Sequence, residues 1–114
     1  MTPARARVHY RNNLHEPITI RRITGSGSTR VVANYSSMAR VFRGERKQLV
    51  GGIAQQDMHA IVYHQYLVDD GLTGEVLIGD YLITDSGVEF SVTEVKPRRV
   101  QAELIGYDLT LRGP

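Results

Sequence analysis

The chain has 114 residues, with 14 lysines and arginines against 12 aspartates and glutamates, and it contains no cysteine. A chain of this length fits one domain and can bury roughly two-thirds of the surface that it exposes when unfolded, so a core is available without disulfides. The lack of cysteine excludes thiol nucleophiles, thiol redox chemistry and metal sites with cysteine ligands. The sequence lacks an apolar run of the ~18 residues that a membrane-spanning helix needs, and it begins without the hydrophobic stretch of a signal peptide. We therefore expect a soluble protein, made in the cytoplasm, without membrane contact.

Charge is distributed unevenly along the chain. Residues 1–50 hold ten arginines and lysines against two glutamates, whereas residues 51–114 hold four against ten acidic residues. The two halves therefore carry formal charges of +8 and −6. Such asymmetry indicates either a basic surface for nucleic acid or two complementary surfaces through which copies or partners dock. If strands from both halves interleave in the fold, the surface charge is mixed instead.

The first 16 residues are basic and irregular. Arg5, Arg7 and Arg11 are interleaved with scattered apolar residues, and prolines at positions 3 and 17 bracket the stretch. We interpret residues 1–16 as an N-terminal arm and residues 17–114 as a single β domain.

Two strands are predicted after this arm. Residues 17–24 alternate between apolar and polar side chains, with Ile18 and Ile20 on one face, which is typical of a half-buried strand. The Gly- and Ser-rich residues 25–30 predict a flexible turn. Residues 31–42 predict a longer strand, because their alternation is the clearest in the chain.

Residues 43–57 are predicted to form a long loop after the second strand. They combine Arg43, Arg46 and Lys47 with the Gly51–Gly52 pair and show little periodicity. Loops of this length are usually functional or mobile.

The next segments are also read as strands. Residues 58–67 predict the third strand, although residues 53–66 also carry a helical stripe that leaves a helix as an alternative. Residues 76–84 predict the fourth strand, interrupted at Gly79.

The C-terminal segment predicts a hairpin and a final pair of strands. Asp85, Ser86 and Gly87 lie between two apolar runs, and Gly87 can adopt the left-handed conformation that closes a hairpin. Strands over residues 88–95 and 100–111 follow, joined by a turn at residues 96–99. In the last strand the apolar set changes phase, which predicts a β-bulge near Gly106. Six strands with non-helical connections predict an all-β fold, a small antiparallel barrel or sandwich.

Catalytic and metal sites are not indicated by the sequence. His59 and His64 are five residues apart and would point to opposite faces of a strand, and the HExxH and facial-triad spacings are missing. The GxSxG pattern of a serine nucleophile is missing too. The paired aspartates at 69 and 70, and those at 80 and 85, lie at predicted turns, where aspartate commonly accepts hydrogen bonds from backbone N–H groups. We expect no enzymatic activity, no metal and no cofactor.

The C-terminal half carries an order of residues that resembles a known family. Residues 78–99, IGDYLITDSGVEFSVTEVKPRR, and residues 102–113, AELIGYDLTLRG, contain Gly79 and Asp80, the hairpin Gly87, Phe90 and Val92 on a strand, a turn at Pro97 and a long last strand. Upstream, ITIRRITG, then Ala39, Arg40 and Val41, then MHAIVYH occur in the matching order. Residues 17–113 thereby resemble the small head-tail joining proteins of tailed phages and phage-like particles. The tryptophan that is frequent in that family is absent here.

The resemblance implies a head-completion protein of the adaptor or stopper kind. Such a protein forms a 6- or 12-fold homo-oligomeric ring between the portal or adaptor ring and the tail proteins, in the neck of the particle, after synthesis in the bacterial cytoplasm. It helps to retain the packaged double-stranded DNA, which it contacts without sequence specificity. Two alternatives stay open: a tail terminator ring protein, which sets helices against a β core, and an independent oligonucleotide-binding β-barrel.

In a ring of this kind we expect roles for the two cationic segments. Arg5, Arg7 and Arg11 of the arm should contact a neighbouring copy or the next ring. Arg43, Arg46 and Lys47 should either face DNA in the lumen, with Gly51 and Gly52 permitting movement, or lie at an intersubunit surface. A simply disordered surface loop is the third possibility for residues 43–57.

Overall fold

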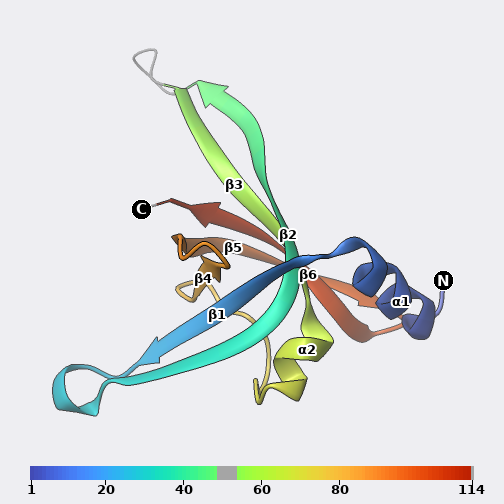
Figure 1. Cartoon of the computed structure of the whole chain (residues 1–114), viewed down its shortest axis with the longest axis horizontal. Coiled ribbons are helices and arrows are strands. Elements are labelled where there is room, and N and C mark those ends of the chain that lie inside the picture. Colours follow the sequence, from blue (N-terminus) through green and yellow to red (C-terminus); the bar gives the residue numbers. More distant parts are fainter. Residues whose placement is uncertain (49–53, 114) are drawn as a thin grey trace.

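The computed structural model describes residues 1–48 and 54–113, in which six strands form one closed antiparallel barrel in the order β1-β2-β3-β6-β5-β4. The strands are β1 (Glu16–Thr24), β2 (Val31–Gln48), β3 (Ala54–Tyr63), β4 (Tyr81–Thr84), β5 (Glu89–Val100) and β6 (Glu103–Arg112). Two helices, α1 (Pro3–Asn13) and α2 (His64–Asp69), and a short 3-10 turn, η1 (Gly27–Thr29), complete the described elements (Figure 1). The prediction of a small all-β barrel of six antiparallel strands is confirmed.

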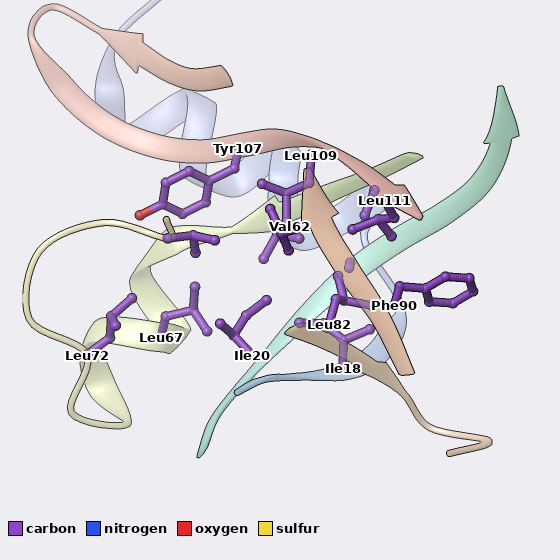
Figure 2. Packing of buried hydrophobic residues seen from close by; sticks show 14 residues of the cluster. Ile18, Ile20, Val62, Leu67, Leu72, Leu82, Phe90, Tyr107, Leu109 and Leu111 are labelled. Carbon is purple, nitrogen blue, oxygen red and sulfur yellow. The ribbon is translucent and has the colours of Figure 1, made fainter. Parts of the chain in front are cut away.

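The core fills the barrel with side chains from alternating strand positions. Figure 2 shows these side chains facing one another, with Phe90 at one end of the barrel and Leu67 and Leu72 at the other. Because Leu67 belongs to α2 and Leu72 to the loop that follows, this helix and loop close one end of the barrel. The strands contribute Ile18, Ile20, Ala39, Ala60, Val62, Leu82, Val92, Tyr107, Leu109 and Leu111.

The hairpin predicted between the fourth and fifth strands is confirmed. Gly87 has a φ of +92°, and its N–H donates to the carbonyl of Thr84 at 2.9 Å. The Thr84 hydroxyl also accepts from the N–H of Val88 at 3.1 Å. A residue with a Cβ is strained at such a φ, so glycine is favoured here.

The bulge predicted near Gly106 is confirmed as well. Arg98 of β5 pairs with Gly106, but the next residue, Arg99, pairs with Leu104, so Ile105 is the extra residue of β6. Ile105, Gly106 and Tyr107 are consecutively buried, which regular alternation would not allow. The bulge changes which side of β6 faces the core.

The prediction that the N-terminal stretch is irregular is wrong, because Pro3–Asn13 is the helix α1. Thr2 caps it, accepting a hydrogen bond from the backbone N–H of Arg5 at 3.2 Å, and Pro3 occupies the first turn, where its missing N–H costs nothing. Only Ala6 is buried within the helix, with Leu14 buried just after it. These two buried residues are too few for the helix to be recognised as amphipathic from its sequence.

Two predicted boundaries in the middle of the chain are wrong. The third strand ends at Tyr63 rather than at residue 67, and α2 follows it directly. The fourth strand begins only at Tyr81, because residues 76–80 form a loop around the buried Asp80. The expectation that all connections are non-helical is therefore also wrong.

Asp80 fixes this loop to the barrel. Its carboxylate accepts from Arg22 Nε at 3.0 Å, from Arg22 Nη2 at 2.9 Å and from the N–H of Leu77 at 2.9 Å. Arg22 also donates to the carbonyl of Glu75 at 2.8 Å. The Gly-Asp pair at 79 and 80 thus ties residues 75–80 to β1 by charge-assisted hydrogen bonds.

The turn predicted at residues 96–99 lies elsewhere. β5 continues through these residues to Val100, and the chain reverses at Gln101 and Ala102, whose φ angles are +50° and +67°. Two central residues with positive φ make a tight two-residue hairpin. Pro97 is tolerated within β5 because β4 pairs only with residues 89–91, which leaves one edge of β5 without a ladder to interrupt.

We predict that Gly106→Ala lowers the free energy of unfolding by about 2 kcal/mol, because a Cβ at this position has no room. It would lie 2.3 Å from Cε2 of Tyr10 on α1 and 2.5 Å from the carbonyl oxygen of Val62. Urea denaturation checks this, with Gly113→Ala as the matched control, since a Cβ there would only touch the Phe90 ring at 3.7 Å. Equal stability of the two variants would show that α1 does not pack tightly on the bulge.

Candidate interaction surfaces

A β-ribbon stands where the long loop was predicted, so that prediction is wrong. β2 continues to Gln48 and β3 begins at Ala54, with Arg46 paired to Gln56 and Gln48 paired to Ala54. The pairing is irregular only between Arg43 and Arg46. This part of the hairpin extends beyond the other strands (Figure 1).

β2 changes its neighbour at Ala39. Residues 31–39 pair with β1 and residues 39–48 pair with β3, so Ala39 is the position that the two ladders share. Each half of β2 therefore runs out of the barrel in its own hairpin (Figure 1). The Cα radius of gyration is 15.0 Å, above the roughly 13 Å typical of a compact chain of this length.

The predicted cations of this segment lie along the β2–β3 ribbon. Arg43 is exposed near its base, and the backbones of Arg46 and Lys47 are paired with β3 further out. Gly51 and Gly52 lie outside the described residues. The structure thus places Arg43, Arg46 and Lys47 on one projecting strand.

The three arginines of the N-terminal stretch are divided between two sides of α1. Arg7 faces the barrel and forms a salt bridge with Glu103 at the β5–β6 turn. Arg5 and Arg11 are exposed and flank the exposed Val8. Arg5 and Arg11 are therefore the arginines of this group that the fold leaves facing outward.

A basic groove runs over the outer surface of β2, β3, β6 and β5 beside α1. It comprises two adjoining depressions of about 390 Å³ and 440 Å³ that share Ile61, Arg98 and Asp108. Cross-strand pairing sets Arg40, Ile61, Asp108 and Lys96 in one row. Arg98 donates to Asp108 from Nε at 2.7 Å.

An exposed aromatic stack lies in the neighbouring row of this groove. Phe42 is 37% exposed and stacks on His59, with ring centroids 5.7 Å apart. The guanidinium of Arg40 lies 5.5 Å from the centroid of the Phe42 ring, which is a cation–π distance. This cluster was not predicted from the sequence, although the alternation of residues 31–42 places Arg40 and Phe42 on the outer face of the strand.

A hollow of about 560 Å³, here called the β1–β4 hollow, lies over β1, β4 and the first half of β2. Pro17, Met38, Tyr66 and Ile83 supply apolar surface, Thr19 and Ser36 supply hydroxyls, and Asp85 is the one charged residue in its lining among the described residues. A second carboxylate stands beside it, because Asp70 accepts from the N–H of Ser36 at 2.8 Å. The hollow is therefore apolar with an acidic margin.

The basic groove and the β1–β4 hollow are centred on different strands of the barrel and approach each other on β2, where Met38 lines the hollow and Arg40 lines the groove. In the closed order of six strands, β6 is the third strand from β1 in either direction, and β3 is the third from β4. α1 packs on β6 and β3, which keeps its arginines on the basic side. The charge asymmetry of the sequence thus corresponds in part to two faces of the folded chain.

One buried pair of titratable groups lies at the closed end of the barrel. The Tyr107 hydroxyl is 2.6 Å from Nδ1 of His64. Burial raises the pKa of Tyr107 to about 12, against the opposing effects of a backbone hydrogen bond from Val76 and of Arg99 and Arg22. Burial also lowers the pKa of His64. Both shifts favour the neutral pair, so the pair is structural in character.

Among the described residues no three acidic or histidine side chains are grouped as metal ligands would be. His64 bonds to Tyr107 and His59 stacks on Phe42, so the two histidines do not meet. Across the residues that the structure describes, no helix is both long and apolar enough to cross a membrane.

No protein-family model matches this sequence, and no curated protein matches it significantly.

We predict that stability falls between pH 10 and about 12, because Tyr107 ionises near pH 10 when unfolded but only near 12 when folded. At acidic pH, stability falls below about pH 6.5, since the unfolded chain protonates His64 more readily than the folded chain. Unfolding free energies measured across pH test both windows. Tyr107→Phe should reduce the alkaline loss without removing it, because burial also raises the pKa of Tyr10 and Tyr63.

Proposed function

We propose that this protein is a structural head-tail connector of a tailed phage or phage-like particle, of the stopper or head-completion kind. Its copies form a ring between the portal or adaptor ring and the tail, and the ring helps to retain packaged double-stranded DNA. The observation that carries the proposal is the pair of different surfaces on the barrel, one basic and one apolar with an acidic margin. Two different, complementary faces on one subunit are what a head-to-tail closed ring requires.

The projecting ribbons support the same proposal. A two-stranded ribbon with no third strand or packed face is only marginally stable in water. The β2–β3 ribbon pairs with β6 only from Met58 onward, so residues 54–56 pair with β2 alone. In a ring, such ribbons can rest on neighbouring copies or on an adjacent ring, which would supply the missing cover.

The balance of helix and strand favours a stopper over a tail terminator. α1 has 11 residues and α2 has 6, well under a quarter of the described residues. A tail terminator would be expected to set more helix than this against its β core. The resemblance of residues 17–113 to head-tail joining proteins is the other support for the stopper assignment.

The cationic ribbon is proposed to face the lumen of the ring. Arg43, Arg46 and Lys47 follow one another along β2, so a ribbon directed inward would bring three positive charges per copy toward DNA. Contacts of this kind need only positive charge and carry no sequence specificity. The competing arrangement places the same ribbon between subunits.

We predict that replacing Arg43, Arg46 and Lys47 by serine leaves folding and ring formation intact but lets filled heads lose DNA. Negative-stain images of the protein with the products of its neighbouring genes would score rings on portals, and nuclease protection would score retained DNA. Arg30→Ser, at the tip of the other hairpin, is the control for loss of an exposed cation. Normal retention together with failure to join the ring would favour the intersubunit arrangement, and a wild-type protein that never joins a portal would contradict the connector role.

A second candidate function is supported by the Arg40, Phe42 and His59 stack. Exposed aromatics beside cations are the platform on which single-stranded nucleic acids stack. An independent oligonucleotide-binding barrel would bind a labelled single strand as a monomer, with affinity that falls steeply with salt and with Phe42→Ala. Fluorescence anisotropy distinguishes the two functions, because the connector needs no such binding in isolation.

A further inference from the structure

We infer that the β1–β4 hollow of one copy receives the exposed stripe of α1 from the next copy in the ring. The stripe consists of Arg5, Val8 and Arg11. The hollow is the apolar depression described above, which has Asp85 in its lining. The inference rests on the proposed ring, for which it names the two surfaces that meet between subunits.

The α1 stripe has the composition of a docking surface. Arg5, Val8 and Arg11 succeed one another at intervals of three, so they lie along one side of the helix. Val8 is 45% exposed, and both arginines are exposed beside it. Among the side chains that the structure describes, no carboxylate forms a salt bridge with Arg5 or Arg11. An apolar residue between two cations therefore faces outward.

The hollow offers the complementary surface. Cross-strand pairing sets Pro17 beside Met38, and Thr19 beside both Ser36 and Ile83, on the outer side of the sheet. Tyr66, from α2, adds an aromatic wall that is 37% exposed. Val8 can pack against this apolar floor while the stems of the arginines lie along it and their charged ends reach the margin.

The opposite charges of the hollow and of the α1 stripe favour a second copy of this chain as the occupant of the hollow. Asp85 lines the hollow, and Asp70 stands at Ser36 on its edge. The exposed side of α1 brings two positive charges to the same contact. Two hollows facing each other would oppose carboxylates, and two α1 stripes would oppose arginines. The unlike pairing avoids like-charge contact, and in a ring it would repeat from copy to copy.

The position of the two surfaces suits a ring. α1 packs on β6 and β3, which lie across the barrel from β1 and β4, the strands that form much of the hollow. Figure 1 shows α1 and β4 on different sides of the barrel. A contact that joins two different surfaces of identical subunits can propagate head to tail, and it closes into a ring when the rotation allows it.

Disulfide trapping tests the contact directly, because the chain contains no cysteine of its own. The variant carrying Val8→Cys and Ile83→Cys is oxidised at high protein concentration and separated by non-reducing electrophoresis. We expect a ladder of multiples that ends at the ring size. Val8→Cys alone should give no species larger than a dimer, and Val8→Cys with Thr93→Cys, an exposed position on β5, should not give the ladder.

Charge exchange tests the same contact without cross-linking. Asp85→Lys in one protein, and Arg5→Glu with Arg11→Glu in another, should each lose assembly into rings on portals. An equal mixture should recover it, because one interface is then wild type and the alternate one has its charges exchanged. Circular dichroism and thermal melting of each variant verify that the monomers are folded.

The outcomes separate this inference from the proposed function. Rings on portals without a Val8–Ile83 ladder, or a mixture that does not recover assembly, would overturn the α1 contact and leave the connector role standing. A ladder in a protein that never joins a portal would support the contact and contradict the connector role.

Discussion

The change of partner along β2 is the constraint on which the rest of the structure depends. β2 has 18 residues, more than one barrel wall can use, and it pairs with β1 up to Ala39 and with β3 from Ala39 onward. Ala39 is fully buried at this crossing, where its small side chain lets the strand pass close to the core. Because each half of β2 has only one ladder, each half leaves the barrel with its partner as a projecting hairpin. The ribbons are thus a consequence of how the barrel closes.

Three local contacts around the barrel hold in place the surfaces to which we assign interactions. The bulge at Ile105 and Gly106 brings β6 close to Tyr10, which seats α1 on the basic side. The bonds from Arg22 to Asp80 hold residues 75–80 against β1. The N–H of Ser36 binds Asp70 and so fixes the loop after α2 at the edge of the hollow. Of the three, the Arg22–Asp80 pair is partly buried and hydrogen-bonded, which is the condition under which polar groups stabilise a small domain.

The candidate surfaces were predictable from the sequence only in part. Arg5 and Arg11 were identified from charge alone, and the structure leaves both of them exposed, whereas Arg7 pairs with Glu103 within the same chain. Charge counts cannot separate these cases, because the helix that divides the arginines between two sides has only Ala6 buried among its residues. The Phe42 and His59 stack and the β1–β4 hollow join residues far apart in the chain. They become visible only once the register of neighbouring strands is known.

The sequence by itself determined the features that depend on one strand and its own turn. Alternation located β1 and the first part of β2, and the phase change in β6 located the bulge, since both record which side of a strand is buried. The Asp-Ser-Gly signal located the hairpin closed by Gly87, since it records the backbone conformation of a turn. Only the tertiary structure decided the β2–β3 ribbon, the docking of α1 and the two-residue turn at Gln101 and Ala102. The outer part of the ribbon pairs with no third strand, the helix is held by a close approach to Gly106, and the turn forms because β5 and β6 pair up to its edge. The physical reason is common to all three: apolar periodicity reports burial, whereas these features arise from backbone pairing and close packing between distant segments.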